Sequence, residues 1–224
     1  VTASYTDGFG NDHSKTSAAT AAVTNVNDDP TGTVAISGTA MEDQVLTASN
    51  TLADEDELGT ITYLWKRNGV AIDGATGATY TLVQDDVGKA ITVTASYTDG
   101  FGNDHSKTSA ATALVVNVNN DPTGTVIISG TTTENQILTA SNTLADEDGL
   151  GELTYEWKRD GVAIDGATGA TYTLTQADVG SVITVTASYI DGQGTQESVT
   201  SAATETIDGI PPTSGDLDGD GDVD

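Results

Sequence analysis

The chain of 224 residues contains no cysteine, so no disulfide can stabilise it, even in an oxidising compartment. Basic residues are also scarce: 7 Lys and Arg against 34 Asp and Glu give a formal net charge of −27. This balance argues against binding to nucleic acid, whose phosphates need Lys and Arg as partners, and against docking on anionic membranes. No apolar run approaches the roughly 20 residues that cross a bilayer, so no membrane insertion is expected in this segment. The composition that remains is typical of secreted β domains.

A repeat of 92 residues organises the sequence. Trp65 returns 92 residues later as Trp157, and the first twenty residues return unchanged at 93–112. The period is too long for solenoid units of about 20–50 residues and matches one complete β domain of about 100 residues. Division at the Asp-Pro steps predicts the truncated end of a preceding repeat (1–29), two complete repeats (30–121 and 122–210), and a linker with the start of a different motif (211–224).

Alternation with a period of two residues predicts β-strands in each repeat. In the stretch 91–97 every second residue is apolar, and the others carry hydroxyl groups. The pairs Asn68-Gly69 and Asp160-Gly161 are typical of tight hairpin turns. For the first complete repeat we predict seven strands, at 34–37, 44–49, 60–67, 70–72, 79–82, 90–97 and 108–116.

The position of the tryptophan indicates the type of β domain. Trp65 lies on the third predicted strand, and an Asp-x-Gly corner (86–88) precedes the sixth, which resembles an immunoglobulin-like sandwich. The stretch YEWKRDGVAIDGATGATYTLTQADVG at 155–180 resembles the cysteine-free immunoglobulin-like, cadherin-like tandem repeats of giant secreted bacterial adhesins. This resemblance implies an all-β fold, with immunoglobulin-like (cadherin-like) β-sandwiches of period 92 residues in an extended rod. It also makes residues 1–29 the sixth and seventh strands of a preceding sandwich.

Acidic residues collect where this fold brings one pole of each repeat together. The start of the repeat, the loop before the third strand and the loop after the sixth strand meet at that pole. Carboxylates held about 4 Å apart repel by roughly 4 kcal/mol at an effective dielectric constant near 20, which favours a bound cation. Calcium fits, because it takes about 6–8 oxygen ligands in flexible geometry. The acids expected there are Asp28, Asp29, Asp54, Asp56 and Asp99 at the first pole, Asp121, Asp146, Asp148 and Asp191 at the second, and Glu42 and Asp86 from the preceding repeat.

The two linkers strengthen the calcium hypothesis. NVNDDP at 25–30 and NVNNDP at 117–122 resemble the calcium-binding linkers of cadherins, which act together with an Asp-x-Asp of the next domain. The resemblance implies linker ligands at 27–29 and 119–121, paired with acids at 54 and 56 and at 146 and 148, with Glu42 as a looser match. Asn120 stands where the first linker has Asp28, so the second linker is expected to bind more weakly. The alternative, that these acids form only a solvated surface, stays open. The linker residues concerned are Asn27, Asp28, Asp29, Asn119, Asn120 and Asp121.

A second kind of calcium motif closes the chain. In GDLDGDGDVD at 215–224, acids fall at positions 1, 3, 5, 7 and 9 of an EF-hand loop, and Gly221 falls at position 6, where the loop turns sharply. The string resembles the first half of a type I dockerin, which implies a cohesin-like partner, although thrombospondin-type calcium repeats use similar strings. The predicted calcium ligands are Asp216, Asp218, Asp220, Asp222 and Asp224.

Catalysis is not expected in this segment. The only two histidines, His13 and His105, occupy the same repeat position, and the third copy has Glu197 there. We therefore interpret the chain as non-catalytic stalk or extender repeats of a large bacterial cell-surface or secreted protein, stiffened by calcium between neighbouring repeats. One alternative is an accessory module of a dockerin-bearing extracellular enzyme that binds surface glycans, with Phe9 and Phe101 as the candidate aromatic contacts. Another is a surface-layer or matrix protein that assembles side by side.

Overall fold

The computed structural model describes residues 1–211, and this part of the chain is almost entirely β. Its elements are sixteen strands and two short 3₁₀ helices, η1 (Gln84–Asp86) and η2 (Gln176–Asp178). Within the same residues, no helix is long and apolar enough to cross a membrane. The five acids predicted to form a terminal calcium loop, Asp216, Asp218, Asp220, Asp222 and Asp224, lie outside the described residues.

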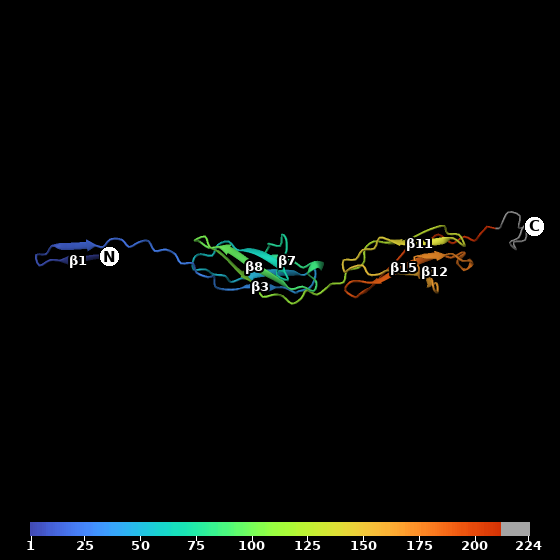
Figure 1. Ribbon diagram of the computed structural model, residues 1–224, viewed down its shortest axis with the longest axis horizontal. Coiled ribbons are helices and arrows are strands. Elements are labelled where there is room, and N and C mark those ends of the chain that lie inside the picture. Colours follow the sequence, from blue (N-terminus) through green and yellow to red (C-terminus); the bar gives the residue numbers. More distant parts are fainter. Residues whose placement is uncertain (212–224) are drawn as a thin grey trace, which may run out of the picture. The chain divides into compact units, whose positions relative to one another are not determined.

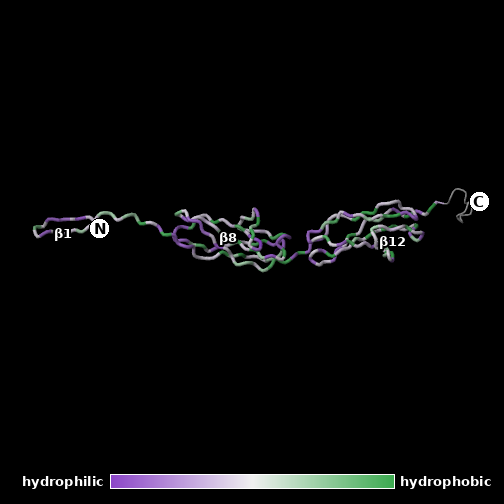
Figure 2. The backbone as a smooth tube through the Cα atoms, in the orientation of Figure 1, coloured by the Kyte–Doolittle hydropathy of each residue, from purple (hydrophilic) through white to green (hydrophobic). Residues whose placement is uncertain are grey.

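The chain begins with a hairpin of β1 (Thr2–Thr6) and β2 (Asp12–Thr16), which pair antiparallel. Every residue of the two strands is exposed, and Figure 2 shows the hairpin mostly purple and white. A two-stranded hairpin without an apolar face has little stability of its own.

Contacts along the chain define two compact units. The first unit holds Val1–Ser37, Thr47–Tyr80 and Thr92–Ala111, and the second holds Gly38–Leu46, Thr81–Ile91 and the chain from Thr112 onward.

The first complete repeat folds into two antiparallel sheets (Figure 1). Both have the strand order of an immunoglobulin-like sandwich, in which the first, second and fifth strands form one sheet and the third, sixth and seventh strands form the other with a short extra edge strand. The three-stranded sheet has the order β3 (Val34–Ser37), β4 (Val45–Asn50) and β7 (Thr79–Thr81). The four-stranded sheet has the order β6 (Val70–Ala71), β5 (Thr62–Arg67), β8 (Ile91–Thr98) and β9 (Asp104–Thr108).

The second complete repeat has the same strand order. Its three-stranded sheet consists of β10 (Val126–Ser129), β11 (Ile137–Asn142) and β14 (Thr171–Thr173). Its four-stranded sheet consists of β13 (Val162–Ala163), β12 (Thr154–Arg159), β15 (Ile183–Ile190) and β16 (Gln196–Thr200). The predicted all-β, immunoglobulin-like fold is thus confirmed, whereas the repeat boundaries remain a sequence-based prediction.

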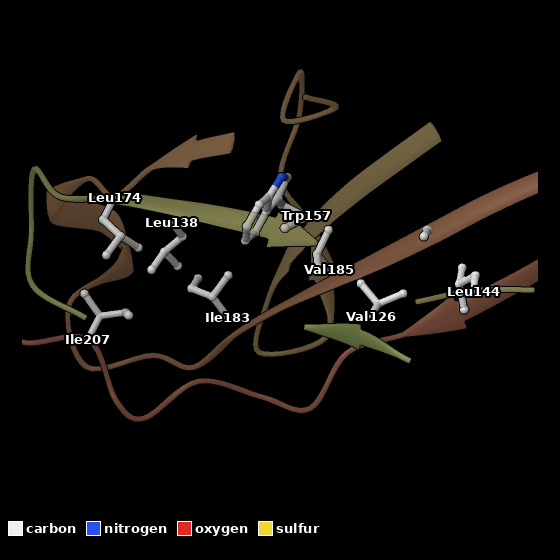
Figure 3. Packing of buried hydrophobic residues seen from close by; sticks show 10 residues of the cluster. Val126, Leu138, Leu144, Trp157, Leu174, Ile183, Val185 and Ile207 are labelled. Carbon is white, nitrogen blue, oxygen red and sulfur yellow. The ribbon is translucent and has the colours of Figure 1, made fainter. Parts of the chain in front are cut away.

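The apolar face of each strand packs into the core of the sandwich. In the second repeat both sheets contribute to one buried cluster, with Leu138 from β11, Trp157 from β12, and Ile183 and Val185 from β15. Figure 3 shows Trp157 in the middle of this cluster, and its indole nitrogen donates a hydrogen bond of 2.8 Å to the Gly169 carbonyl. In the first repeat the indole nitrogen of Trp65 donates the matching hydrogen bond to the Gly77 carbonyl. Each tryptophan therefore fills its core and has a hydrogen-bond partner for its one polar atom.

One strand prediction was wrong. The seventh strand was expected at 108–116, but β9 ends at Thr108, and Val115 and Val116 form only isolated parallel bridges with Val87 and Met41. The loop before β9 is short because the Asp99 carboxylate accepts hydrogen bonds from the amides of residues 101 and 103, so that strand pairing resumes at Asp104. The apolar run at 113–116 had suggested a strand, whereas β9 itself is polar and half-exposed.

Candidate metal centre

At the first pole the loop before β5 brings two aspartates together. The Asp54 carboxylate accepts a hydrogen bond of 2.5 Å from the Tyr97 hydroxyl on β8 and one of 2.9 Å from the Asp56 amide. The hydrogen bond from Tyr97, followed by the one from Asp56, lowers the pKa of Asp54. Asp56 is buried and accepts a hydrogen bond of 2.9 Å from the Asp28 amide of the linker. The structure therefore joins Asp28, Asp54 and Asp56, as predicted from the sequence.

Asp99 follows β8, and its surroundings keep it ionised. Burial opposes the charge, but hydrogen bonds from the Asn103 side chain and amide and from the Phe101 amide outweigh it and lower the pKa of Asp99 to about 2. The His105 imidazole on β9 lies beside both acids: its Nε2 is 3.4 Å from Asp99 Oδ2 and 3.8 Å from Asp54 Oδ2. Its ring also stacks on Tyr97, with the ring centres 5.4 Å apart.

The second pole repeats this geometry with different partners. Tyr189 on β15 donates a hydrogen bond of 2.5 Å to Asp146, whose other oxygen accepts 2.8 Å from the Asp148 amide. The Asn120 amide of the linker donates to Asp148 Oδ2 at 2.7 Å, and the Asn119 side chain donates to Glu197 at 2.9 Å. The sequence prediction therefore placed linker and loop residues together correctly.

Two buried carboxylate oxygens at the second pole lack any hydrogen-bond partner. They are Oδ1 of Asp148, a residue that is 3% exposed, and Oδ2 of Asp191, a residue that is 6% exposed. The other Asp191 oxygen accepts hydrogen bonds from the amides of Gln193 and Thr195. Leaving a buried charged oxygen unpaired costs on the order of 1–3 kcal/mol or more, so both oxygens mark places for a positively charged or donating group.

Glu42 lies in the second unit together with the second linker. Its side chain accepts a hydrogen bond of 3.2 Å from the Val118 amide, and the residue is 2% exposed. Burial raises the pKa of Glu42, and the carboxylates of Asp148 and Glu147 add to the rise. The Asn117 amide oxygen, in the same linker, is buried and has no partner either.

Asp86 was expected among the metal ligands, but it lies fully buried within its own repeat. It accepts a hydrogen bond of 2.9 Å from the Val83 amide and so stabilises the first turn of η1. Its counterpart Asp178 forms an ion pair of 2.7 Å with Arg159 and accepts a hydrogen bond of 2.9 Å from the Tyr172 hydroxyl. These contacts explain the burial of the carboxylate without a metal ion, because a buried charge is stabilised by such partners.

The remaining predicted residues are exposed. Asn27, Asp28, Asp29, Asn119 and Asp121 all have exposed positions in the linkers. A surface hollow is lined by Asp28, Asp29, Asp54 and Glu55 with two neighbours, and an equivalent one by Asn120, Asp121, Asp146 and Glu147 with theirs. Within residues 1–211, no group of three or more His, Cys, Asp or Glu side chains is arranged to hold a metal ion.

Sequence reasoning missed the two tyrosines and the residue opposite each of them. The inward alternation of β8 placed Tyr97 in the core, and it is 5% exposed, but its hydroxyl reaches Asp54 at the pole. The sequence did contain a signal for the facing residue, since His13, His105 and Glu197 occupy one repeat position. The exchange of histidine for glutamate changes the charge at the pole, because His105 lies beside Asp54 and Asp99 and Glu197 contacts the linker.

Comparisons with known proteins identify similar solved structures but do not assign the chain to a family. No family model matches the chain, and no curated protein matches it. Similar structures are the three N-terminal domains of the highly immunogenic outer capsid protein of bacteriophage RB49 (19% identity, TM-score 0.28), a Ca²⁺-stabilised adhesin that helps an Antarctic bacterium bind ice (17%, 0.31), and tandem Ig repeats of Dlar (11%, 0.24). They cover 76%, 92% and 78% of this chain, which itself covers 58%, 55% and 95% of theirs.

The chain thus spans little more than half the length of the first two structures. The immunoglobulin-like assignment rests on the strand order and on the matching core tryptophans of the two complete repeats.

Proposed function

We propose that this chain forms non-catalytic extender repeats of a bacterial cell-surface or secreted protein, and that calcium binds at the acidic poles and stiffens the linkers. Two β-sandwiches of the same strand order in one chain, each preceded by a short acidic linker, support a spacer role. The net charge of −27 agrees with a calcium-rich extracellular medium, where cations screen the repulsion between carboxylates.

The observation that carries the calcium proposal is the pair of buried, unpartnered carboxylate oxygens on Asp148 and Asp191. Calcium accepts carboxylate, amide and carbonyl oxygens at about 2.3–2.6 Å. Asp146, Asp148 and Asp191 would hold the ion at the second pole with oxygens of the linker 117–121. Asp54, Asp56 and Asp99 would do so at the first pole with Asp28. The ion supplies positive charge, so the carboxylates no longer repel one another.

Calcium is expected to raise the melting temperature of the chain. Binding to the folded state at 100 times the Kd adds about 2.7 kcal/mol. For domains of about 60–100 residues, each kcal/mol raises Tm by about 4–8 °C, so we expect a rise of about 10 °C or more. The measurement is differential scanning calorimetry with millimolar calcium and with chelator. An Asp218→Asn/Asp220→Asn background removes the contribution of the terminal motif.

Two further variants make this measurement specific. Asp148→Asn should remove most of the rise in the second repeat, whereas Asp165→Asn, an equal loss of charge on an exposed turn, should leave it unchanged. Identical melting curves with and without calcium would show that these acids are only surface charge.

The terminal motif supports an attachment role on sequence grounds alone. We propose that residues 216–224 begin a calcium loop of dockerin type, with a cohesin-like protein as its partner. Other calcium repeats with the same spacing of acids would bind the ion without that partner.

A glycan-binding module is the second candidate, and one observation favours it. Phe101 is 64% exposed on the loop between β8 and β9, and Phe9 is 93% exposed on the matching loop of the first hairpin. An exposed aromatic ring can stack on an apolar sugar face. Retention on a polysaccharide gel that disappears in Phe101→Ala would favour this function over the spacer.

A further inference from the structure

One strand position differs between the poles. In β8 and β9, Tyr97 pairs with His105, and in the first hairpin Tyr5 pairs with His13. In β15 and β16 the matching pair is Tyr189 and Glu197. The histidine or glutamate therefore projects from the same register position in all three hairpins.

The histidine fills the space beside the loop aspartate. In the first repeat, His105 Nε2 lies 3.4 Å from Asp99 Oδ2, and the side chain is only 7% exposed. The first hairpin repeats this arrangement without the rest of a sandwich: His13 Nε2 lies 3.1 Å from Asp7 Oδ2, and its ring stacks on Tyr5 with centres 4.9 Å apart. The hairpin alone therefore forms the contact between histidine and aspartate, without the loop that carries Asp54 in the first repeat.

Glutamate at this position brings no ring nitrogen to the loop aspartate. Asp191 is the counterpart of Asp99. Asp99 Oδ2 accepts a hydrogen bond of 2.9 Å from the Asn103 side chain and also faces the imidazole, whereas Asp191 Oδ2 is buried without a partner and Thr195 stands where the first repeat has Asn103. Instead of a ring nitrogen, Glu197 brings a third carboxylate near Asp146 and Asp191. Tyr189 pairs with Glu197 across the two strands, and its hydroxyl donates to Asp146, so Glu197 and Asp146 lie on either side of the same tyrosine. Burial raises the pKa of Tyr189, and the charges of Glu197 and Asp191 add to the rise.

We propose that this strand position decides whether the pole binds a cation: histidine occupies the space beside the loop aspartate, whereas Glu197 completes a divalent-cation site with Asp146 and Asp191. The proposal rests on the calcium binding proposed above and assigns it mainly to the second pole. Glu197 now accepts a hydrogen bond from the Asn119 side chain, so it reaches the ion by turning away from that amide.

This assignment reverses the order of affinity expected from the linkers. Asn120 in place of Asp28 removes one negative charge from the second linker, but Glu197 in place of His105 adds one at the pole and removes a competing nitrogen. Because Asp191 Oδ2 is buried and unpartnered, while Asp99 Oδ2 already accepts a hydrogen bond from Asn103 and faces the imidazole, the second pole is the stronger site.

Terbium luminescence tests the proposal. Terbium replaces calcium at oxygen sites and emits when a nearby tyrosine is excited, and Tyr189 donates to Asp146 at 2.5 Å. In the full chain, on the Asp218→Asn/Asp220→Asn background, we expect one dominant sensitised site that calcium displaces. Glu197→His should weaken binding of both ions at that site at least tenfold, and Glu205→Gln, an exposed acid lost elsewhere, should not. His105→Glu should add a second sensitised site, near Tyr97.

Both exchanges install the residue that the other repeat already carries, and the far-ultraviolet circular dichroism of each variant verifies folding. Unchanged affinity in Glu197→His together with no gain in His105→Glu would overturn this proposal. Calcium-dependent melting of the wild type would in that case leave the proposed function standing. A wild type that binds neither ion would overturn both.

Discussion

Trp157→Ala is expected to lower the free energy of unfolding of the second repeat by about 3–5 kcal/mol. The side chain is fully buried between the two sheets, and the neighbouring side chains cannot collapse far enough to fill the space that it leaves. The hydrogen bond from the indole to the Gly169 carbonyl is lost as well. Domains of this size are stable by only about 5–15 kcal/mol, so the variant should be close to unfolding at 37 °C.

Urea denaturation of the chain measures this effect, and the repeats supply their own controls. Trp65→Ala makes the same change in the first repeat, so each variant should shift the unfolding of its own repeat. Val162→Ala removes a side chain that is 71% exposed and should change the stability by no more than about 0.5 kcal/mol. A loss below 1 kcal/mol in Trp157→Ala would contradict the packing described for the core.

Arg159→Met is expected to destabilise the second repeat by about 2–4 kcal/mol. Removing one partner of a buried ion pair typically costs about 3–5 kcal/mol, and the value is lower here because water reaches part of the Arg159 side chain, which is 30% exposed. The cost arises because the Asp178 carboxylate stays buried without its cation. Lys158→Met is the control, since Lys158 pairs with Glu156 at 3.2 Å on the surface and should contribute at most about 1 kcal/mol.

The pH dependence of stability provides an independent measure of the same pair. Burial works against the charge on Asp178, but hydrogen bonds from the Thr175 amide, Arg159 and Tyr172 outweigh it, so the folded-state pKa of Asp178 is lowered. The unfolded-state pKa is about 3.9. The stabilisation is therefore fully present above that value and is lost as the pH falls through the lower, folded-state pKa. Arg159→Met should lose less stability than the wild type on acidification, and equal losses would show that the pair does not stabilise the fold.

The sequence was sufficient to predict most of the fold because the chain contains its own comparison. Alternation by two residues and the return of Trp65 as Trp157 indicated the strands, and the strand at 34–37 has the predicted bounds. The Asn68-Gly69 turn has positive φ angles of 45° and 82°, as this hairpin type requires. The seventh strand was misplaced because β9, with the sequence DHSKT, contains no apolar residue, and the Asp99 side chain that shortens its loop could not be inferred from an apolar pattern.

The sequence was sufficient to predict where the acids gather but not which contacts they make; the metal site itself stays a prediction. The topology correctly brought the linker at 117–121 to Asp146 and Asp148, because both precede strands at one end of a sandwich. The sequence could not show that the Asp86 side chain is buried. An acid that is exposed in a corner loop has the same sequence pattern as one that accepts a hydrogen bond within a 3₁₀ turn. The sequence could not show that one Asp191 oxygen lacks a partner while the other accepts hydrogen bonds, because this depends on how the side chain is oriented.

Small-angle X-ray scattering of residues 30–210, in millimolar calcium and then in chelator, tests the central claim that calcium at the poles stiffens the linkers. We expect a fixed maximum dimension in calcium and a shorter or broadly distributed one after chelation, with Asp148→Asn behaving like the chelated wild type in both solutions. A maximum dimension that is the same with and without calcium would contradict the claim.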